Sequence, residues 1–324
     1  MKFIKENVKY FIILVLIVLL FYLKLPYYVM CPGGSINVTD RVSVDNHYDK
    51  YNGSINMLYV SEYDATPIGY LMAKLRGYDV VSNKERQINN ENSYEIEKRS
   101  KIMRDNSLNI ATIVAYNTAG KKIDIKKKNN VVVATTKDNN LKIGDIILKV
   151  NDIYCDEIDE IKDIIKNSEV DSNLKFNIIR DNKEMVVYNK VVLDNDEKVI
   201  GVIIMTDYEY TTDPKIDIKF KDSESGSSGG LMLTLTIYNA ISEEDLIKGR
   251  NIAGTGTISN DGTVGEIDGI KYKIMGAHTD NMDIVFVPSA NYDEAMETKN
   301  KYNYDLEIIK VDTFNEVLEY LRNN

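Results

Sequence analysis

The 324-residue sequence predicts an α+β protein with an N-terminal transmembrane helix, a β-rich module and a C-terminal α/β domain. Three observations carry this prediction. An uncharged apolar run occupies residues 10–23, strand-like segments joined by polar turns fill residues 126–196, and strands alternate with amphipathic helices in residues 197–324. The length allows more than one hydrophobic core.

The composition excludes several classes of function. A net charge of −10 argues against a nucleic-acid partner, because phosphate binding needs a basic surface. The cysteines Cys31 and Cys155 form no CxxC pair, so neither a zinc site nor a redox motif is indicated. With His47 and His278 as the only histidines, a His-rich metal site is excluded, and we expect neither a metal nor a cofactor.

The apolar run Tyr10–Leu23 is short for a bilayer, which a helix of about 20 apolar residues can cross. Continued to Met30, with the Lys24 amine reaching the interface, it becomes long enough. We therefore predict a cytoplasmic tail at residues 1–9, an anchor at residues 10–30 and an extracytoplasmic remainder. This orientation follows from the basic residues before the run, Lys2, Lys5 and Lys9.

A cleaved signal peptide is the alternative interpretation of this run. It is disfavoured because no small-x-small cleavage site follows the apolar residues. A lipoprotein signal fits poorly as well, because Tyr28-Val29-Met30 before Cys31 lacks small residues. A retained single-pass anchor in the cell membrane is the prediction.

Residues 31–125 are expected to form an extracytoplasmic αβ region. It opens with turn residues at 32–34, continues into a strand at 55–63 and contains a helix over 93–118 that ends at Ala119-Gly120.

Residues 126–196 form the next predicted unit. A strand at 131–136 is followed by the turn and alternating strand of IGDIILKVND (143–152). A helix over 158–167 and two strands joined by an Asp-Asn turn complete the unit. This order resembles a PDZ domain, and a generic small αβ fold is the alternative.

A Ser/Gly-rich turn lies in residues 197–324, between a strand at Ile216–Phe220 and an apolar helix. A serine there lies at the positive end of the helix, where free backbone N–H groups can bind an oxyanion. An N-capping serine is the structural alternative. A phosphate-binding loop fails because no GxxxxGK[ST] arrangement occurs in the chain.

The following block, residues 249–278, predicts a strand, a turn at Asn260-Asp261-Gly262, a second strand that ends at Ile267 and a helix that starts near Gly269. Together, SSGGLMLTLTIYN and AGTGTISNDGTVGEIDGIKYK resemble the proteolytic domain of the Lon family. The order of the segments along the chain is similar to that of membrane-anchored Lon-like serine proteases with a PDZ domain. The resemblance covers nearly the whole chain and is most specific over residues 226–278. Strands and helices in the C-terminal segments are assigned a core role.

The resemblance implies specific site residues. Ser228 matches the nucleophile, because Gly226 and Gly230 fix the register of the nucleophile stretch. Ser227 and Gly229 replace the family's Pro and Ala, which could weaken the turn or alter the oxyanion hole. The acidic residue that often lies three positions before the serine is Ser225 here, with Glu224 and Asp222 nearby, so that role stays unassigned.

The matching lysine segment is Gly269-Ile270-Lys271-Tyr272-Lys273, in which the second lysine, Lys273, corresponds to the catalytic base. Lys271 is the runner-up. Thr255, in Gly254-Thr255-Gly256, matches the family threonine that hydrogen-bonds the lysine. His278 and His47 are expected to be structural.

The chemistry requires these residue types. A serine hydroxyl needs a base within hydrogen-bond reach, and a lysine is a base only when it is neutral. Burial away from carboxylates lowers the pKa of a lysine from about 10.4, because desolvation disfavours the ammonium. Backbone N–H groups near Ser228 would stabilise the tetrahedral oxyanion.

These observations predict an ATP-independent, extracytoplasmic serine endopeptidase with a Ser–Lys dyad, Ser228 and Lys273. Its substrates would be peptides, or small or partly unfolded membrane or secreted proteins, recruited by the PDZ-like module. No nucleotide partner is expected, and the resemblance is compatible with a homo-oligomer. The first alternative is a non-catalytic, membrane-anchored PDZ scaffold with a decayed protease domain. The second is a phosphate-binding enzyme that uses the Gly-rich turns.

Overall fold

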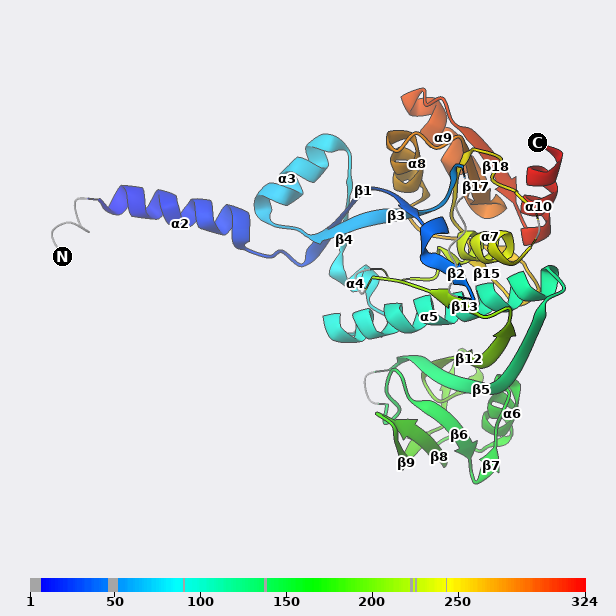
Figure 1. Cartoon of the computed structure of the whole chain (residues 1–324). Coiled ribbons are helices and arrows are strands. Elements are labelled where there is room, and N and C mark those ends of the chain that lie inside the picture. Colours follow the sequence, from blue (N-terminus) through cyan, green and yellow to red (C-terminus); the bar gives the residue numbers. More distant parts are fainter. Residues whose placement is uncertain are drawn as a thin grey trace.

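The computed structural model describes residues 7–45, 52–89, 91–136, 139–221, 224, 226–242 and 244–324. Two six-stranded sheets dominate this part of the chain, and a long helix, α5 (Ser93–Thr118), lies between them (Figure 1). We call the sheet that contains the first and the last strand of the chain the first sheet, and the other the second sheet.

Helix α2 (Val8–Tyr22) stands apart from the body in Figure 1 and buries none of its side chains. Among the described helices, none is both long enough and apolar enough to cross a bilayer. The prediction of one helical anchor over residues 10–30 is wrong in its extent. Residues Tyr27–Met30 are instead the start of a strand, because their backbones pair with strands on both sides.

The first sheet has the strand order β18-β17-β14-β3-β1-β4. Strands β14, β17 and β18 run parallel to β3, whereas β1 pairs antiparallel with β3 and β4. Its strands are β1 (Tyr27–Asn37), β3 (Ser54–Asp64), β4 (Asp79–Ser82), β14 (Asn251–Gly254), β17 (Ile284–Pro288) and β18 (Glu307–Val311).

This set of strands corrects the expectation that residues 31–125 form a separate region. Strand β3 pairs directly with β14, with Ser54 opposite Asn251, so the N-terminal strands and the C-terminal strands form one sheet. The expected turn at residues 32–34 is also wrong, because these residues lie in β1 at an irregularity between Pro32 and Gly34.

Helices cover both faces of the first sheet, as the alternating side chains of β17 require. Val285 and Val287 pack toward α8 and α9, whereas Ile284 and Phe286 pack toward α7 and α10. The predicted helix after the Ser/Gly turn and the C-terminal helices are confirmed. They are α7 (Gly230–Ile241), α8 (Ile270–Thr279), α9 (Tyr292–Tyr302) and α10 (Phe314–Asn323).

Short elements complete this body. The segment between β3 and α5 supplies α3 (Pro67–Arg76) and α4 (Asn83–Arg86). The remaining short elements are η1 (Thr39–Arg41), β2 (Val42–Val44), β13 (Ile216–Ile218), β15 (Thr257–Ile258), β16 (Val264–Gly265) and η2 (Ser289–Asn291). The predicted strand at Ile216–Phe220 is thus confirmed in its first three residues, which pair with β2.

The second sheet has the order β12-β5-β6-β8-β9, with β7 added beside β6. It extends from residue 122 to residue 213, beyond the predicted unit at 126–196 on both sides. Its strands are β5 (Lys122–Thr135), β6 (Ile146–Val150), β7 (Ile153–Tyr154), β8 (Asn173–Arg180), β9 (Lys183–Lys190) and β12 (Val202–Asp213). The same stretch also contains α6 (Ile158–Asn167) and a separate two-stranded sheet of β10 (Val192–Asp194) and β11 (Glu197–Val199).

Local sequence signals explain this sheet well. The Asp181-Asn182 turn between β8 and β9 has φ values of 49° and 60°, the left-handed conformation that tight hairpins prefer. Helix α6 has the predicted bounds and buries Ile161 and Ile165 against Phe176. Both the predicted hairpin and the predicted helix are confirmed.

Helix α5 confirms the predicted helix over 93–118. It begins with a capping box in which the Asn92 side chain accepts from the backbone of Glu95, and the Glu95 carboxylate accepts from the backbone of Asn92. One side of α5 packs on α7, and the other packs on β5 and β12 of the second sheet.

Candidate active site

The candidate nucleophile lies at the junction between a glycine-rich loop and the start of α7. Gly226 has a φ of 89°, which favours glycine at the entry to this turn. Two backbone hydrogen bonds then join the turn to the end of β14, from Gly256 N to Ser228 O at 2.8 Å and from Leu231 N to Gly256 O at 3.0 Å. These bonds fix the position of Ser228, whose side chain is half-buried.

The candidate base comes from the first turn of α8. Gly269, with a φ of 70°, begins the helix, and Lys273 is 3% exposed. The Lys273 Nζ atom lies 2.8 Å from Ser228 Oγ and 2.8 Å from Thr255 Oγ1. The structure therefore brings together the three residues that the sequence selected.

Thr255 is fully buried and connects the other two residues. Its hydroxyl donates to the carbonyl oxygen of Ser228 at 3.0 Å and accepts from Lys273 Nζ. Its own backbone N–H donates to Phe286 O on β17 at 3.1 Å, which fixes it to the sheet. The lysine amine is thus held by a side chain whose position is set by two strands and the nucleophile turn.

Burial lowers the pKa of Lys273 to about 7, because desolvation disfavours its charged form. The carboxylate of Asp268 opposes this effect and raises the pKa. Asp268 is itself exposed, so water screens its charge. A substantial fraction of Lys273 is therefore neutral at physiological pH, as a general base requires.

The structure gives a steric reason for Gly229, which replaces the alanine of the family pattern. A Cβ atom at Gly229 would lie 1.9 Å from the Sδ atom of Met57 on β3. The thioether of Met57 thus occupies the space that an alanine methyl would need. Ser227, the other departure, offers its carbonyl oxygen to Gly230 N and to the hydroxyl of Ser107 on α5.

The rejected candidates lie elsewhere. Lys271 Nζ donates to Gly77 O at 3.2 Å, away from Ser228. The exposed ring of His278 stacks on Tyr304 with a centroid distance of 3.9 Å. His47 is outside the described residues.

The acidic residues near the nucleophile play no visible part in the dyad. Glu224 forms an ion pair with Arg41 that lowers the pKa of Glu224 against the desolvating effect of its burial. Asp222 and Ser225 lie outside the described residues.

Sequence reasoning missed three residues that contact the nucleophile loop. Ser107 and Arg104 donate to the carbonyl oxygens of Ser227 and Glu224, and Met57 packs against Gly229. No local signal marks them, because Ser107 and Arg104 lie in the middle of an ordinary helix and Met57 in an ordinary strand.

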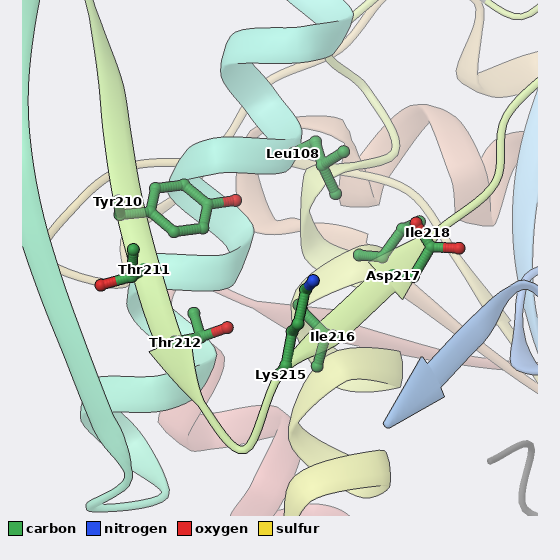
Figure 2. Close-up of a pocket in the computed structure, with 8 residues that line it drawn as sticks. All are labelled: Leu108, Tyr210, Thr211, Thr212, Lys215, Ile216, Asp217 and Ile218. Carbon is green, nitrogen blue, oxygen red and sulfur yellow. The ribbon is translucent and has the colours of Figure 1, made fainter. Parts of the chain in front are cut away.

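A surface cavity lies apart from the three site residues. It has a volume of about 450 Å³ and lies between α5, β12 and β13 (Figure 2). Tyr210 and Leu108 face each other across it, and Lys215 and Asp217 lie on the β13 side. No nucleophile with a base beside it lines this space. In the ranges that the structure describes, no cluster of His, Cys, Asp and Glu is arranged to hold a metal ion.

Comparisons with known proteins agree with the geometry. Residues 207–323 match the family described as the Lon protease (S16) C-terminal proteolytic domain. A Lon protease of Mesomycoplasma hyopneumoniae is 31% identical over 98 residues, 30% of this chain and 11% of that protein. An archaeal Lon protease of Halobacterium salinarum is 29% identical over 125 residues, 38% of this chain and 18% of that protein.

The chain therefore spans between about a tenth and a fifth of the length of these two relatives. Among solved structures, the PDZ domain of an SdrC-like protein from Listeria monocytogenes superposes with a TM-score of 0.22. That comparison has 21% identity and covers 23% of this chain and 85% of that domain. The similarity to the C-terminal proteolytic domain of Lon proteases is thus confined to the C-terminal part of the chain, residues 207–323.

Proposed function

We propose that this chain, whose C-terminal region is similar to the proteolytic domain of Lon proteases, is an endopeptidase with Ser228 as nucleophile and Lys273 as base. A single observation carries the proposal: a buried amine with a pKa of about 7 lies 2.8 Å from the hydroxyl of Ser228. Both the geometry and the protonation state suit proton abstraction at neutral pH.

The mechanism follows from these contacts. Neutral Lys273 accepts the Ser228 proton as Ser228 Oγ bonds to the scissile carbonyl carbon, and the carbonyl oxygen becomes an oxyanion. Backbone N–H groups near the start of α7 stabilise that charge. The Lys273 ammonium then gives its proton to the leaving amine, the C–N bond breaks and an acyl-enzyme remains.

Deacylation uses the same base. Neutral Lys273 takes a proton from a water molecule, the resulting hydroxide attacks the ester carbonyl, and Ser228 leaves with the proton returned by Lys273. Thr255 keeps the amine aimed at Ser228 throughout, because its hydroxyl bonds both the amine and the Ser228 carbonyl.

We propose that the second sheet recruits the substrate, because the order of strands and helix in its sequence resembles that of a PDZ domain. Strand β12 lies at one end of the strand order, and its Thr206 carbonyl already accepts from Asn106 on α5. We propose that an added peptide strand pairs with the outer edge of β12 before Thr206. Because the sequence contains no GxxxxGK[ST] motif, we propose that cleavage proceeds without ATP and is directed at flexible or partly unfolded chains.

Membrane attachment through α2 is also proposed, with the catalytic region outside the cytoplasm. Every residue from Tyr10 to Tyr22 on this helix is apolar or aromatic, and each of these side chains is exposed. Basic residues precede the helix in the sequence. Fractionation of cells should leave the full chain in membranes washed with high salt and release it with detergent. Recovery in the salt wash would contradict attachment through an apolar helix.

The test of catalysis compares the full chain with Ser228→Ala and Lys273→Ala on an unstructured polypeptide substrate. We expect cleavage by the wild type alone. Equal cleavage by all three proteins would refute the dyad. Absence of cleavage by the wild type, combined with retained peptide binding, would favour the non-catalytic scaffold.

A further inference from the structure

Helix α5 holds the loop that carries Ser228. The Arg104 guanidinium donates to Glu224 O at 2.8 Å, and the Ser107 hydroxyl donates to Ser227 O at 3.1 Å. In the reverse direction, Gly226 N donates to the backbone carbonyl of Ser100 at 3.1 Å. The three α5 residues follow an i, i+4, i+7 spacing, so they occupy one face of the helix.

The opposite face of α5 holds strand β12 of the second sheet. Asn106 donates to Thr206 O at 2.5 Å, and Asn109 donates to the Asp207 carboxylate at 2.7 Å. The Tyr210 hydroxyl donates to the Asn109 side-chain oxygen at 3.2 Å. Around the helix axis, positions 106 and 109 point to the side roughly opposite to positions 100, 104 and 107.

The side chains that make these contacts are buried or partly buried. Asn106 and Ser107 are adjacent in sequence, both are buried, and each uses its side chain on a different partner. A buried side chain that loses such a partner retains the cost of its desolvation, so each contact constrains geometry strongly. A displacement of β12 would therefore strain its hydrogen bonds to α5 and would shift the helix with it.

The seam between α5 and β12 is not filled by side chains along its whole length. Beyond the asparagine contacts, the cavity of about 450 Å³ separates Leu108 from Tyr210 and Thr212 (Figure 2). Close packing resists movement, whereas a cavity permits it at low cost. The polar contacts of Asn106 and Asn109 therefore help to fix β12 to α5, and further along the helix Tyr116 donates to Pro214 O just after the strand.

We infer that Arg104 and Ser107 are positioning residues for the nucleophile, and that Asn106 and Asn109 couple them to β12 of the second sheet. The inference rests on the proposed peptidase function and adds regulation to it. A peptide that adds a strand to β12 would act on Ser228 through α5, without contact with the dyad.

Kinetics on the full chain test the positioning role. We expect Ser107→Ala to lower kcat about tenfold with little change in KM, because Ser107 contacts the loop backbone rather than substrate. The midpoint of the pH profile should stay near 7, since the surroundings of Lys273 are unchanged. Arg104→Lys, which keeps a donor, should retain more activity than Arg104→Met. A loss through KM alone, or equal losses in the two Arg104 variants, would overturn the positioning role.

A double-mutant cycle tests the coupling. Asn109→Ala, on the β12 side, should lower kcat by about threefold, and its combination with Ser107→Ala should lower kcat by less than the product of the two losses. Glu97→Gln serves as the matched control, because Glu97 lies on the exposed part of α5 and pairs only with Lys101 among its described contacts. Independent, multiplying losses would refute the coupling.

Hydrogen exchange separates this inference from the proposed function, because it requires no turnover. We expect faster exchange in residues 226–231 for both Ser107→Ala and Asn109→Ala, and no change for Glu97→Gln. Unchanged exchange in Asn109→Ala would overturn the coupling even if the peptidase is active. Faster exchange in a chain whose cleavage does not depend on Ser228 would retain the coupling and reject the peptidase proposal.

Discussion

The two sheets of this protein differ in how far apart in the sequence their strands lie. The second sheet is built from one continuous stretch, residues 122–213, whereas the first sheet joins strands from residues 27–82 to strands from residues 251–311. The three candidate site residues belong to the first sheet and its helices. The comparison indicates that the site depends on long-range pairing, and that α5 is one connection between the second sheet and the loop of Ser228.

Substitution of Lys273 should give the largest difference between the two regions, because it should abolish peptidase activity at the first sheet and leave peptide binding by the second sheet intact. Lys273→Met removes the base, so we expect peptidase activity to fall by at least about 10³-fold. Peptide binding by the second sheet should be unchanged, which titration with a fluorescent peptide can measure. Residual activity above one tenth would show that another group supplies the base.

The same substitution should stabilise the fold. A buried lysine with a pKa of about 7 opposes folding at neutral pH, because the unfolded side chain, with a pKa near 10.5, still binds its proton. The free energy of unfolding of the wild type should therefore rise between about pH 7 and pH 10.5, relative to Lys273→Met. Denaturant titrations across this range measure the difference, and parallel curves would contradict the buried neutral amine.

Truncation of Phe176 tests the opposite half of the comparison. Phe176→Ala removes a fully buried ring from the core of the second sheet and should lower its free energy of unfolding by about 3–5 kcal/mol. The α8 and α9 side of the first sheet shares no core with Phe176, so amide exchange there should be unaffected. Exchange that rises equally in both sheets would show a single cooperative unit.

A methyl group at Gly229 should have an intermediate effect on the site. Gly229→Ala forces a contact with Met57, so we expect a loss of about 10- to 100-fold in kcat/KM. Met57→Ala in the same chain removes the obstacle and should restore part of the activity. If Met57→Ala restores no activity, the loss comes from a change in the turn and not from the contact with Met57 on β3.

The smallest expected effect is the pH dependence of the wild type. With a Lys273 pKa of about 7, the neutral fraction of the amine rises about tenfold from pH 6 to pH 8. The kcat/KM value should follow this rise with a midpoint near 7, while peptide binding by the second sheet stays flat. A midpoint above 9 would mean that the amine is hydrated in the active protein.

Local patterns determined much of the fold. The bounds of α5 and α6, the Asp181-Asn182 turn and the helix that begins after Gly269 were predicted from periodicity and turn residues, which act over a few positions. The resemblance to a family selects Ser228, Thr255 and Lys273 from the sequence alone.

Only the tertiary structure decided what surrounds these residues. The bond from Asn56 to Ile252 O spans 196 positions, and no periodic signal encodes that β3 and β14 are neighbours. The same holds for Met57 beside Gly229 and for Ser107 beside Ser227. Side-chain spacing in the sequence specifies which face of an element is apolar, whereas the choice of partner for that face depends on the burial of all elements together.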